Sequence, residues 1–453
     1  MNVEQVRSRF PALSTSYIYA DNAGGSQCTA GVIHAITDYL SNTNVQLGAD
    51  YSIGVKSTTR VSMGPTATAM LTHASSPSEI IFSNSSTQLA ENLARAMEPS
   101  IKRDGQEEFI ATLEHEANVG PWQRLAKRTN NHIHFWKPTA IECSRGNASR
   151  SNPFAIGYTL ESLEPLLSAK TRLVALSACS NILGSFFDIK SIVQRIRDVV
   201  HQKSDGKQKV EIVVDCVAYA PHRRINTVDW DVDYAFFSYY KVYGPHTAAM
   251  WVRASTSNAS LNSINHYFVT DPANRLQLGG PGYELTYATS AVLDYLFSIA
   301  NPNHTSLLLT SLPSETQSRE LSNGLDESFK LMEAHERTLV ERLLSFLTAE
   351  AQWNRGIRVV GSDDNVDRAP TISFVVLDGS NGEPRMRSKD VVSGVDKLGN
   401  IGIRFGHFYA ARLIDFLGLA ADDGIVRVSL VHYNTLEEVD KIIAALKQSI
   451  GIP

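Results

Sequence analysis

The sequence has little cysteine: there are four among 453 residues, and no two of them form a Cys-x-x-Cys pair. That scarcity argues against a disulfide framework and against a zinc site built on paired cysteines. We therefore expect reduced thiols and no metal. The first residues are polar and carry an early charge, unlike a secretory signal, which predicts a cytoplasmic protein. The cysteines are Cys28, Cys143, Cys179 and Cys216.

A strong excess of one charge and a long apolar run are also missing. There are 42 Lys and Arg against 47 Asp and Glu, a formal charge of −5, with a pI of about 6.2. Nucleic-acid binding would need a basic face, and crossing a bilayer would need about 18 consecutive apolar residues. We expect neither a nucleic-acid partner nor a membrane partner. Hydrophobic residues make up 43 %, as in ordinary globular proteins.

Several catalytic signatures are absent. The sequence has no G-x-S-x-G, H-E-x-x-H, Walker A or G-x-G-x-x-G motif. The glycine-rich segment Leu278–Gly282 follows no good strand candidate and is interpreted as a turn. Serine hydrolases, zinc proteases and nucleotide-binding folds are therefore poorly supported.

The first two thirds of the chain alternate apolar strand-like runs with helical patterns. Such alternation is typical of a parallel sheet covered by helices. Helices are expected at 30–41 and 86–97, and strands at 79–82, 109–113, 172–177, 210–214 and 234–237.

The last third has a different pattern. A helix at 327–350, strands at 357–360 and 371–376, and a helix opened by the capping-box pair Thr435 and Glu438 predict a compact α+β unit. The polar segments 143–153 and 312–326 are interpreted as surface excursions, the second of them approaching this unit.

Polar side chains follow all five predicted strands of the first part. Ligands of open α/β sheets bind beyond the carboxyl ends of the strands, so these side chains predict a site there. Taken singly, each has a simpler explanation, such as a helix cap or a satisfied turn. The segments are Ser83–Thr87, Glu114–Asn118, Ser177–Asn181, Asp215 and Ser238–Pro245.

The chemistry of these groups fits one cofactor. Asp215 follows an apolar run and is costly to bury without a cation, and Lys241 lies between aromatic residues, where an amine becomes a nucleophile able to form a Schiff base. The hydroxyl-rich turn before residue 86 suits a phosphate, because a helix amino end favours anions. A phosphate cradle, a carboxylate for a ring nitrogen and an amine for an aldehyde together predict pyridoxal phosphate (PLP).

Six segments resemble the class V aminotransferase family, and most closely its cysteine-desulfurase-like subfamily. The resemblance runs in order from Val3 to Leu446. The segments are Tyr19–Gly25, Glu114–Trp122, Ser180–Gly184, Val214–Asp215, Ser238–Pro245 and Val426–Thr435.

The resemblance implies an α/β fold of PLP fold type I. A large domain at 16–300 would hold a mostly parallel seven-stranded sheet between helices. A smaller α+β domain would comprise 1–15 and 301–453. It further implies a homodimer with active sites at the subunit interface and an amino-acid substrate.

Roles at the site are also implied by position. Lys241 would carry PLP, Asp215 would pair with its ring nitrogen and His115 would stack on the ring, making these three the catalytic residues. Asn181 would lie near the ring oxygen, with Ala218 beside it. The phosphate would be held by Ser86, Thr87 and Ser238. Tyr240 would contact the cofactor where desulfurases commonly carry a His, and Gly280 would offer only backbone donors to a neighbouring subunit's phosphate. The substrate would be bound by Ala23, Gly24, Arg404, Tyr409 and Arg427. Of these, Arg427 would bind the α-carboxylate of the substrate.

Three positions depart from the subfamily pattern. Tyr409 stands where desulfurases carry a nucleophilic cysteine, and a phenol with a pKa near 10 cannot accept sulfur. Ala218 replaces a Gln or His, which opens space beside the cofactor. Gly280 replaces a hydroxyl residue. The fold survives these changes, but desulfurase activity is not expected.

The resulting functional hypothesis is an enzyme acting at Cα of an amino acid through an external aldimine and a quinonoid. Carbon–carbon bond formation is favoured, as a Mannich-type cyclisation with or without decarboxylation. Family members of loline-type alkaloid biosynthesis in fungi imply a place in secondary metabolism. The alternatives are a cysteine desulfurase or carbon–sulfur lyase, an aminotransferase or epimerase, and a PLP-fold protein kept only for binding.

Overall fold

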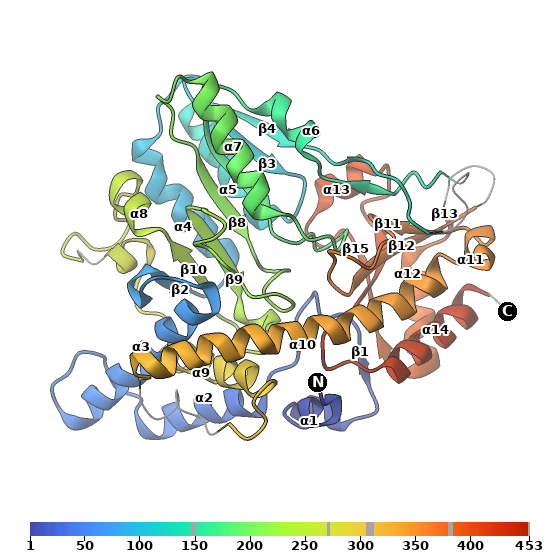
Figure 1. Ribbon diagram of the computed structural model, residues 1–453, viewed down its shortest axis with the longest axis horizontal. Helices are drawn as coiled ribbons and strands as arrows, with labels where there is room; N and C mark the ends of the chain where they lie inside the picture. The colour runs from blue at the N-terminus through green and yellow to red at the C-terminus, as the bar shows by residue number, and fades with distance from the viewer. Residues whose placement is uncertain (146–150, 270–271, 305–311, 379–383, 452–453) are drawn as a thin grey trace.

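A seven-stranded sheet forms the centre of the computed structural model, which describes residues 1–145, 151–269, 272–304, 312–378 and 384–451 (Figure 1). The strand order is β2-β10-β9-β8-β7-β3-β4, and only β10 runs against the others. The mostly parallel seven-stranded sheet is therefore confirmed. Its strands are β2 (Ile80–Ser83), β3 (Glu108–Thr112), β4 (His132–Trp136), β7 (Thr171–Ser177), β8 (Glu211–Asp215), β9 (Tyr234–Ser238) and β10 (Ala248–Val252).

Helices cover both faces because alternate residues of each strand point to opposite sides. Ile212 and Val214 of β8 pack with one group of helices, whereas Val213 packs with another. The first group is α2 (Ala30–Asn42), α3 (Ser52–Thr72), α7 (Ile189–Lys203), α9 (Tyr283–Ser298) and the first part of α10 (Glu315–Leu347). The second is α4 (Ser86–Met97) and α5 (Gly120–Thr129).

A smaller antiparallel sheet is built from the end of the chain. Its order is β11-β12-β16-β15, with β13 added at β12. The helices packed on it are the last part of α10, α12 and α14. The elements are β11 (Ile357–Val360), β12 (Thr371–Leu377), β13 (Pro384–Met386), β15 (Arg404–Gly406), β16 (Ile425–Ser429), α12 (Ser388–Gly399) and α14 (Leu436–Ile450).

Short elements connect these layers. β1 pairs in parallel with β14, and β5 pairs with β6. None of the helices in the described ranges is long and apolar enough to cross a membrane. The short elements are α1 (Val3–Arg7), α6 (Leu160–Leu163), α8 (Ala254–Ser260), α11 (Glu350–Asn354), α13 (Ala411–Phe416), β1 (Ile18–Tyr19), β5 (Thr139–Ala140), β6 (Ile156–Gly157) and β14 (Ile401–Gly402).

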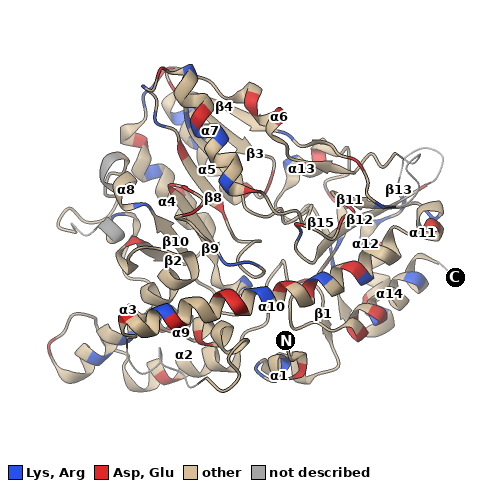
Figure 2. Ribbon diagram, viewed as in Figure 1, with Lys and Arg blue, Asp and Glu red and all other residues tan. Residues whose placement is uncertain are grey.

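Helix α10 corrects one expectation from the sequence. Its first turn begins at Glu315, so the segment 312–326 is mostly helix and not a surface excursion. The Ser-, Glu- and Asn-rich composition hid a capping box, in which Ser314 accepts from the Gln317 backbone and the Gln317 side chain accepts from Ser314. Leu321 and Leu325 then pack into the core beneath the large sheet. Charged residues of both signs occur along α10 (Figure 2).

Helix α10 also belongs to both cores. Its Phe329 and Met332 pack beneath the large sheet, whereas Leu339 and Leu343 pack against the small sheet. The amino-terminal segment, placed by sequence with the smaller domain, contributes buried side chains to the larger core through Val6, Phe10 and Leu13. The division at residue 300 stays a prediction. The expected excursion at 143–153 lies partly outside the described residues.

Candidate active site

A cavity opens at the carboxyl ends of β7, β8 and β9 and at the start of α4. It lies where the polar strand ends predicted a site. Nine of the expected residues line it: Ser86, Thr87, His115, Asn181, Asp215, Ala218, Ser238, Tyr240 and Lys241. Their separation in sequence is large, so only the sheet order brings them together.

The hydroxyl groups form a cradle at the amino end of α4. Ser85 caps the helix by accepting from the Gln88 backbone at 3.2 Å. The Ser86 and Ser238 hydroxyls are hydrogen-bonded at 2.7 Å, which joins the end of β9 to the first turn of α4. Unpaired backbone N–H groups and the helix dipole favour an anion there. The cradle therefore fits a phosphate group.

Asp215 and Lys241 are two buried titratable groups of the cavity wall. Burial raises the pKa of Asp215 to about 6, although the nearby Lys241 opposes this rise. Burial, helped by the charge of Arg427, lowers the pKa of Lys241 to about 8. A lowered pKa increases the neutral fraction of the amine near neutral pH, and the neutral amine is the nucleophile.

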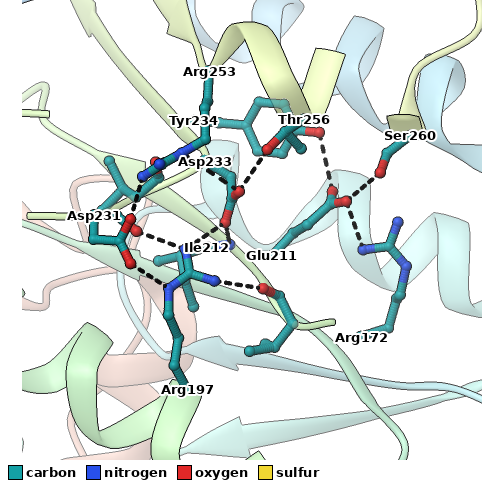
Figure 3. Close-up of polar contacts among 12 residues, drawn as sticks. Arg172, Arg197, Glu211, Ile212, Asp231, Asp233, Tyr234, Arg253, Thr256 and Ser260 are labelled. Atoms are coloured by element: carbon teal, nitrogen blue, oxygen red, sulfur yellow. Dashed lines mark hydrogen bonds and ion pairs between the residues drawn. The ribbon is translucent and has the colours of Figure 1, made fainter. Parts of the chain in front are cut away.

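At the opposite edge of the sheet, buried carboxylates have a structural role and are paired with arginines (Figure 3). There Glu211 is paired with Arg172 at 3.0 Å and accepts from the Tyr234 hydroxyl at 3.0 Å. Asp233 likewise pairs with Arg197 at 3.0 Å. At the cavity, by contrast, the hydrogen bond described for the Asp215 carboxylate is the one from the Val217 N–H, at 2.8 Å. The carboxylate of Asp215 therefore keeps capacity for a ligand.

His115 is held as a neutral ring. Its Nδ1 accepts from the Ala117 N–H at 3.1 Å, which leaves Nε2 as the protonated nitrogen of the neutral tautomer. Burial and the nearby Lys241 lower its pKa to about 3. The ring is 5.4 Å from that of Tyr409, centroid to centroid. A flat, neutral ring at this wall suits stacking on an aromatic cofactor.

Arg427 is not among the residues that line the cavity; it contacts Asn181 of the cavity wall and is 1 % exposed. Its Nη1 donates to the Asn181 carbonyl at 3.2 Å, its Nη2 donates to Asp21 at 2.8 Å, and the Phe408 ring lies 3.7 Å from Cζ. Asn181 Nδ2 donates to the Phe408 carbonyl at 3.0 Å. Among the described residues, Asn181 Oδ1 is buried without a hydrogen-bond partner. A ligand donor, such as the hydroxyl of a cofactor ring, would satisfy it.

Tyr409 stands at the rim of the site on a left-handed backbone. Phe408 and Tyr409 have φ of 48° and 61°, a conformation that costs energy in residues with side chains. The Tyr409 carbonyl accepts from the Glu116 N–H at 2.8 Å, which fixes the loop beside His115. The side chain is 63 % exposed and so is available to a ligand at the mouth.

The other expected residues are less directly placed. The Ala23 N–H donates to the Ser429 hydroxyl at 2.9 Å and the Gly24 N–H to the Asp21 carbonyl at 2.9 Å, so both amides already have acceptors. Gly280 is not among the residues lining the cavity. Its role toward a second subunit stays a prediction, as do the individual roles of the residues that line the site.

Sequence reasoning missed several members of the site. Ser85 and Cys179 line the cavity inside segments that were recognised, but neither was singled out. Asp21 lies inside the Tyr19–Gly25 segment and pairs with Arg427. Glu114 precedes His115 in the sequence and is fully buried, which an acidic residue at a strand end does not by itself indicate.

Glu114 supports the turn that carries Asn181. Its Oε2 accepts from the Ser180 hydroxyl at 2.8 Å, and the Ser180 oxygen accepts from the Leu183 N–H at 2.9 Å. Burial raises the pKa of Glu114 from 4.5 to about 7. The folded state therefore prefers the protonated acid, and the stability that this preference gives is lost as pH rises toward 7.

We expect Glu114→Gln to remove this loss. Between pH 5 and pH 8 the wild type should lose about 2 kcal/mol of unfolding free energy relative to the variant, at 1.36 kcal/mol per pKa unit. Denaturant unfolding of both proteins at each pH measures the difference. A difference that stays constant across this range would show that Glu114 is ionised at neutral pH in the folded protein.

Comparisons with known proteins agree with this arrangement. The family described as aminotransferase class-V matches residues 18–307 and 325–442. The aminotransferase-like protein FGM3 of Gibberella zeae is 38 % identical over 455 residues, 98 % of each chain. The cysteine desulfurase-like protein ustD of Aspergillus flavus is 30 % identical over 453 residues, 99 % of this chain and 91 % of that one.

Solved structures share the fold. The cysteine desulfurase of Thermococcus onnurineus superposes with a TM-score of 0.77 at 20 % identity, covering 99 % of this chain and 98 % of that one. The desulfurase CsdA of Escherichia coli gives 0.75 at 20 % identity, covering 100 % and 99 %. PLP fold type I is thereby confirmed for the chain described above.

Proposed function

The chain belongs to the class V aminotransferase family, with cysteine-desulfurase-like relatives, and is an enzyme with PLP as cofactor; we propose that it forms a carbon–carbon bond at Cα of an amino-acid substrate. The form we propose is a Mannich-type cyclisation in secondary metabolism. The observation that carries this proposal is Tyr409, which stands at the mouth of the site beside His115 where a desulfurase needs a thiol. Ala218 in the cavity wall leaves room for a substrate larger than cysteine.

The residues of this chain divide the work. The chemistry that PLP would supply is withdrawal of electrons from a bond at Cα of the substrate. Ser86 and Ser238 would hold its phosphate, and Asp215 would hold a proton at its ring nitrogen. Lys241 Nζ, with its pKa lowered to about 8, would take and return a proton near neutral pH.

Arg427 orients the substrate. Its guanidinium is held by the Asn181 carbonyl and by the Phe408 ring, so its position is set before an α-carboxylate binds. The phenol of Tyr409 closes the exposed side. No thiol competes for the new bond at this rim, because Cys179, the cysteine in the cavity wall, is buried and its pKa is raised by burial.

The first expected result is negligible release of sulfide from L-cysteine. The persulfide route needs a thiolate at the mouth, and Tyr409 cannot supply one. Sulfide assays on wild type and Tyr409→Cys check this, and a trace of activity in the variant would show that loop geometry is intact. Turnover by the wild type at about one per second or faster, typical of enzymes, would favour the desulfurase alternative.

The second expected result separates bond formation from transamination. With candidate amino acids in deuterated water, the cofactor should return to its aldehyde form after each turnover, because the site offers a place for an electrophile at Cα. Absorbance spectra of the cofactor and deuterium incorporation at Cα measure this. Stoichiometric conversion to pyridoxamine phosphate, reversed by a 2-oxo acid, would identify an aminotransferase and overturn the proposal.

We also propose a homodimer, with Gly280 directed to the second subunit. Exposed apolar side chains support it on α2, at the start of α3 and in the loop that contains Gly280. They are Ile33, Leu40, Tyr51, Ile53, Val55 and Leu278, each more than 40 % exposed.

A further inference from the structure

Three charged side chains, those of Arg427, Asp21 and Arg404, follow one another in contact, starting beside Asn181 of the cavity wall. Asp21 Oδ1 accepts from Arg427 Nη2 at 2.8 Å, and Asp21 Oδ2 is 3.8 Å from Arg404 Nη1. The exposed fraction of the side chain rises from 2 % at Arg427 through 30 % at Asp21 to 51 % at Arg404. Asp21 therefore bridges a buried and a solvated guanidinium.

Asp21 occupies the part of Arg427 that a carboxylate ligand needs. Nη1 already donates a hydrogen bond to the Asn181 carbonyl, and Phe408 covers one face of the guanidinium. Nε is buried without a partner among the described residues, so the edge formed by Nε and Nη2 is the remaining fork. A bidentate carboxylate would take both nitrogens, and Asp21 holds one of them.

We propose that Asp21 is a stand-in for the substrate carboxylate: it neutralises Arg427 in the free enzyme, is displaced when a carboxylate ligand binds, and is then held by Arg404. This inference rests on the proposed role of Arg427. It gives Arg404 a different part from the direct substrate contact implied by resemblance. Asp21 then determines the specificity for carboxylate ligands, because a neutral ligand cannot replace the negative charge of the displaced Asp21 side chain beside Arg427.

Asp21 and Arg427 differ in their exposure to solvent. The Asp21 side chain is 30 % exposed, whereas the Arg427 charge is buried and would be costly without a counter-ion. Gly24 keeps the space beside Asp21, because a Cβ at that position would lie 2.7 Å from Asp21 Oδ2. Exchange of one carboxylate for another also preserves the charge near Lys241, whose pKa Arg427 lowers and Asp21 raises.

The test uses propionate, a carboxylate without the amine that would react with the cofactor, and propionamide as its neutral analogue. Dissociation constants are measured on the PLP-loaded enzyme from changes in cofactor absorbance. Asp21→Asn should bind propionate about tenfold more tightly than wild type, because no internal carboxylate has to leave. Asp21→Ser is a second variant with the same expected direction. Propionamide binding should not change.

Variants of Arg404 provide the second part of the test. Arg404→Gln should weaken propionate binding severalfold in the wild type but not in Asp21→Asn, since its effect passes through Asp21. Arg412→Gln is the matched control, because this rim arginine pairs with Glu116 at 3.3 Å. An equal loss from Arg404→Gln in both backgrounds, or no tightening in both Asp21 variants, would overturn the inference.

Arg427→Gln separates this inference from the proposed function. Loss of the preference for propionate over propionamide in this variant shows that the carboxylate site is Arg427. If the preference survives, the carboxylate role of Arg427 fails and the inference fails with it. Thermal melting and bound PLP are recorded for each variant, so that a folding defect is recognised.

Discussion

Lys241→Ala should yield a protein without covalently attached PLP and with activity reduced by about 10⁴-fold or more. The reduction follows because this side chain supplies both the nucleophilic amine and the general base. Lys241 is 6 % exposed and lines the cavity with Asp215 and His115. Borohydride reduction followed by mass spectrometry of the peptides checks the attachment, and absorbance checks the yellow colour.

Lys190→Ala is a suitable control for Lys241→Ala, since Lys190 is exposed and pairs with Asp229 at 2.6 Å. It should retain the colour and the reducible bond. If Lys241→Ala keeps a borohydride-reducible bond to PLP, another lysine carries the cofactor and the assignment of the site is wrong.

Asp215→Asn is expected to lower kcat/KM by about 10²- to 10³-fold while leaving PLP bound. An amide cannot hold the proton at the ring nitrogen as a carboxylate does. Steady-state kinetics with an amino-acid substrate and a PLP titration separate turnover from cofactor affinity. A variant with unchanged kcat/KM would show that the ring nitrogen needs no carboxylate here.

The chain provides a matched comparison for Asp215→Asn at the other edge of the same sheet. Asp233 is buried too, but it pairs with Arg197 at 3.0 Å and accepts from the Thr256 hydroxyl at 2.7 Å. Asp233→Asn should therefore reduce stability while leaving the turnover of the folded protein unchanged. This comparison distinguishes Asp215, whose charge we expect to serve catalysis, from Asp233, whose charge we expect to serve stability.

The sequence predicted most of the sheet because its strands are continuous apolar runs. Strand β8 was expected at 210–214 and is found at Glu211–Asp215, and α4 has the expected bounds. The start of α10 was missed, since its polar first turns carry little hydrophobic pattern until Leu321. Periodicity shows which face of an element is buried, and it says little about where a polar helix begins.

Pairs of polar residues were harder to predict than strands. The strand-end rule identified Asp215 and Lys241 because each follows an apolar run. Asp21 and Arg427 are 406 residues apart, and no local pattern in either segment indicates the other. Glu114 was overlooked for the same reason, since its partner Ser180 lies 66 residues away. Single-sequence reasoning finds candidate groups, but the fold decides which of them meet.

Helix α10 has a consequence for how the molecule comes apart. A single 33-residue helix supplies buried side chains to both hydrophobic cores. If either core unfolded, α10 would lose its packing contacts with that core while still being bound to the other core. Unfolding of one core therefore destabilises the other core as well. The protein should therefore lose both cores in one calorimetric transition. Cutting the chain within α10 should release two fragments that are each less stable than the whole.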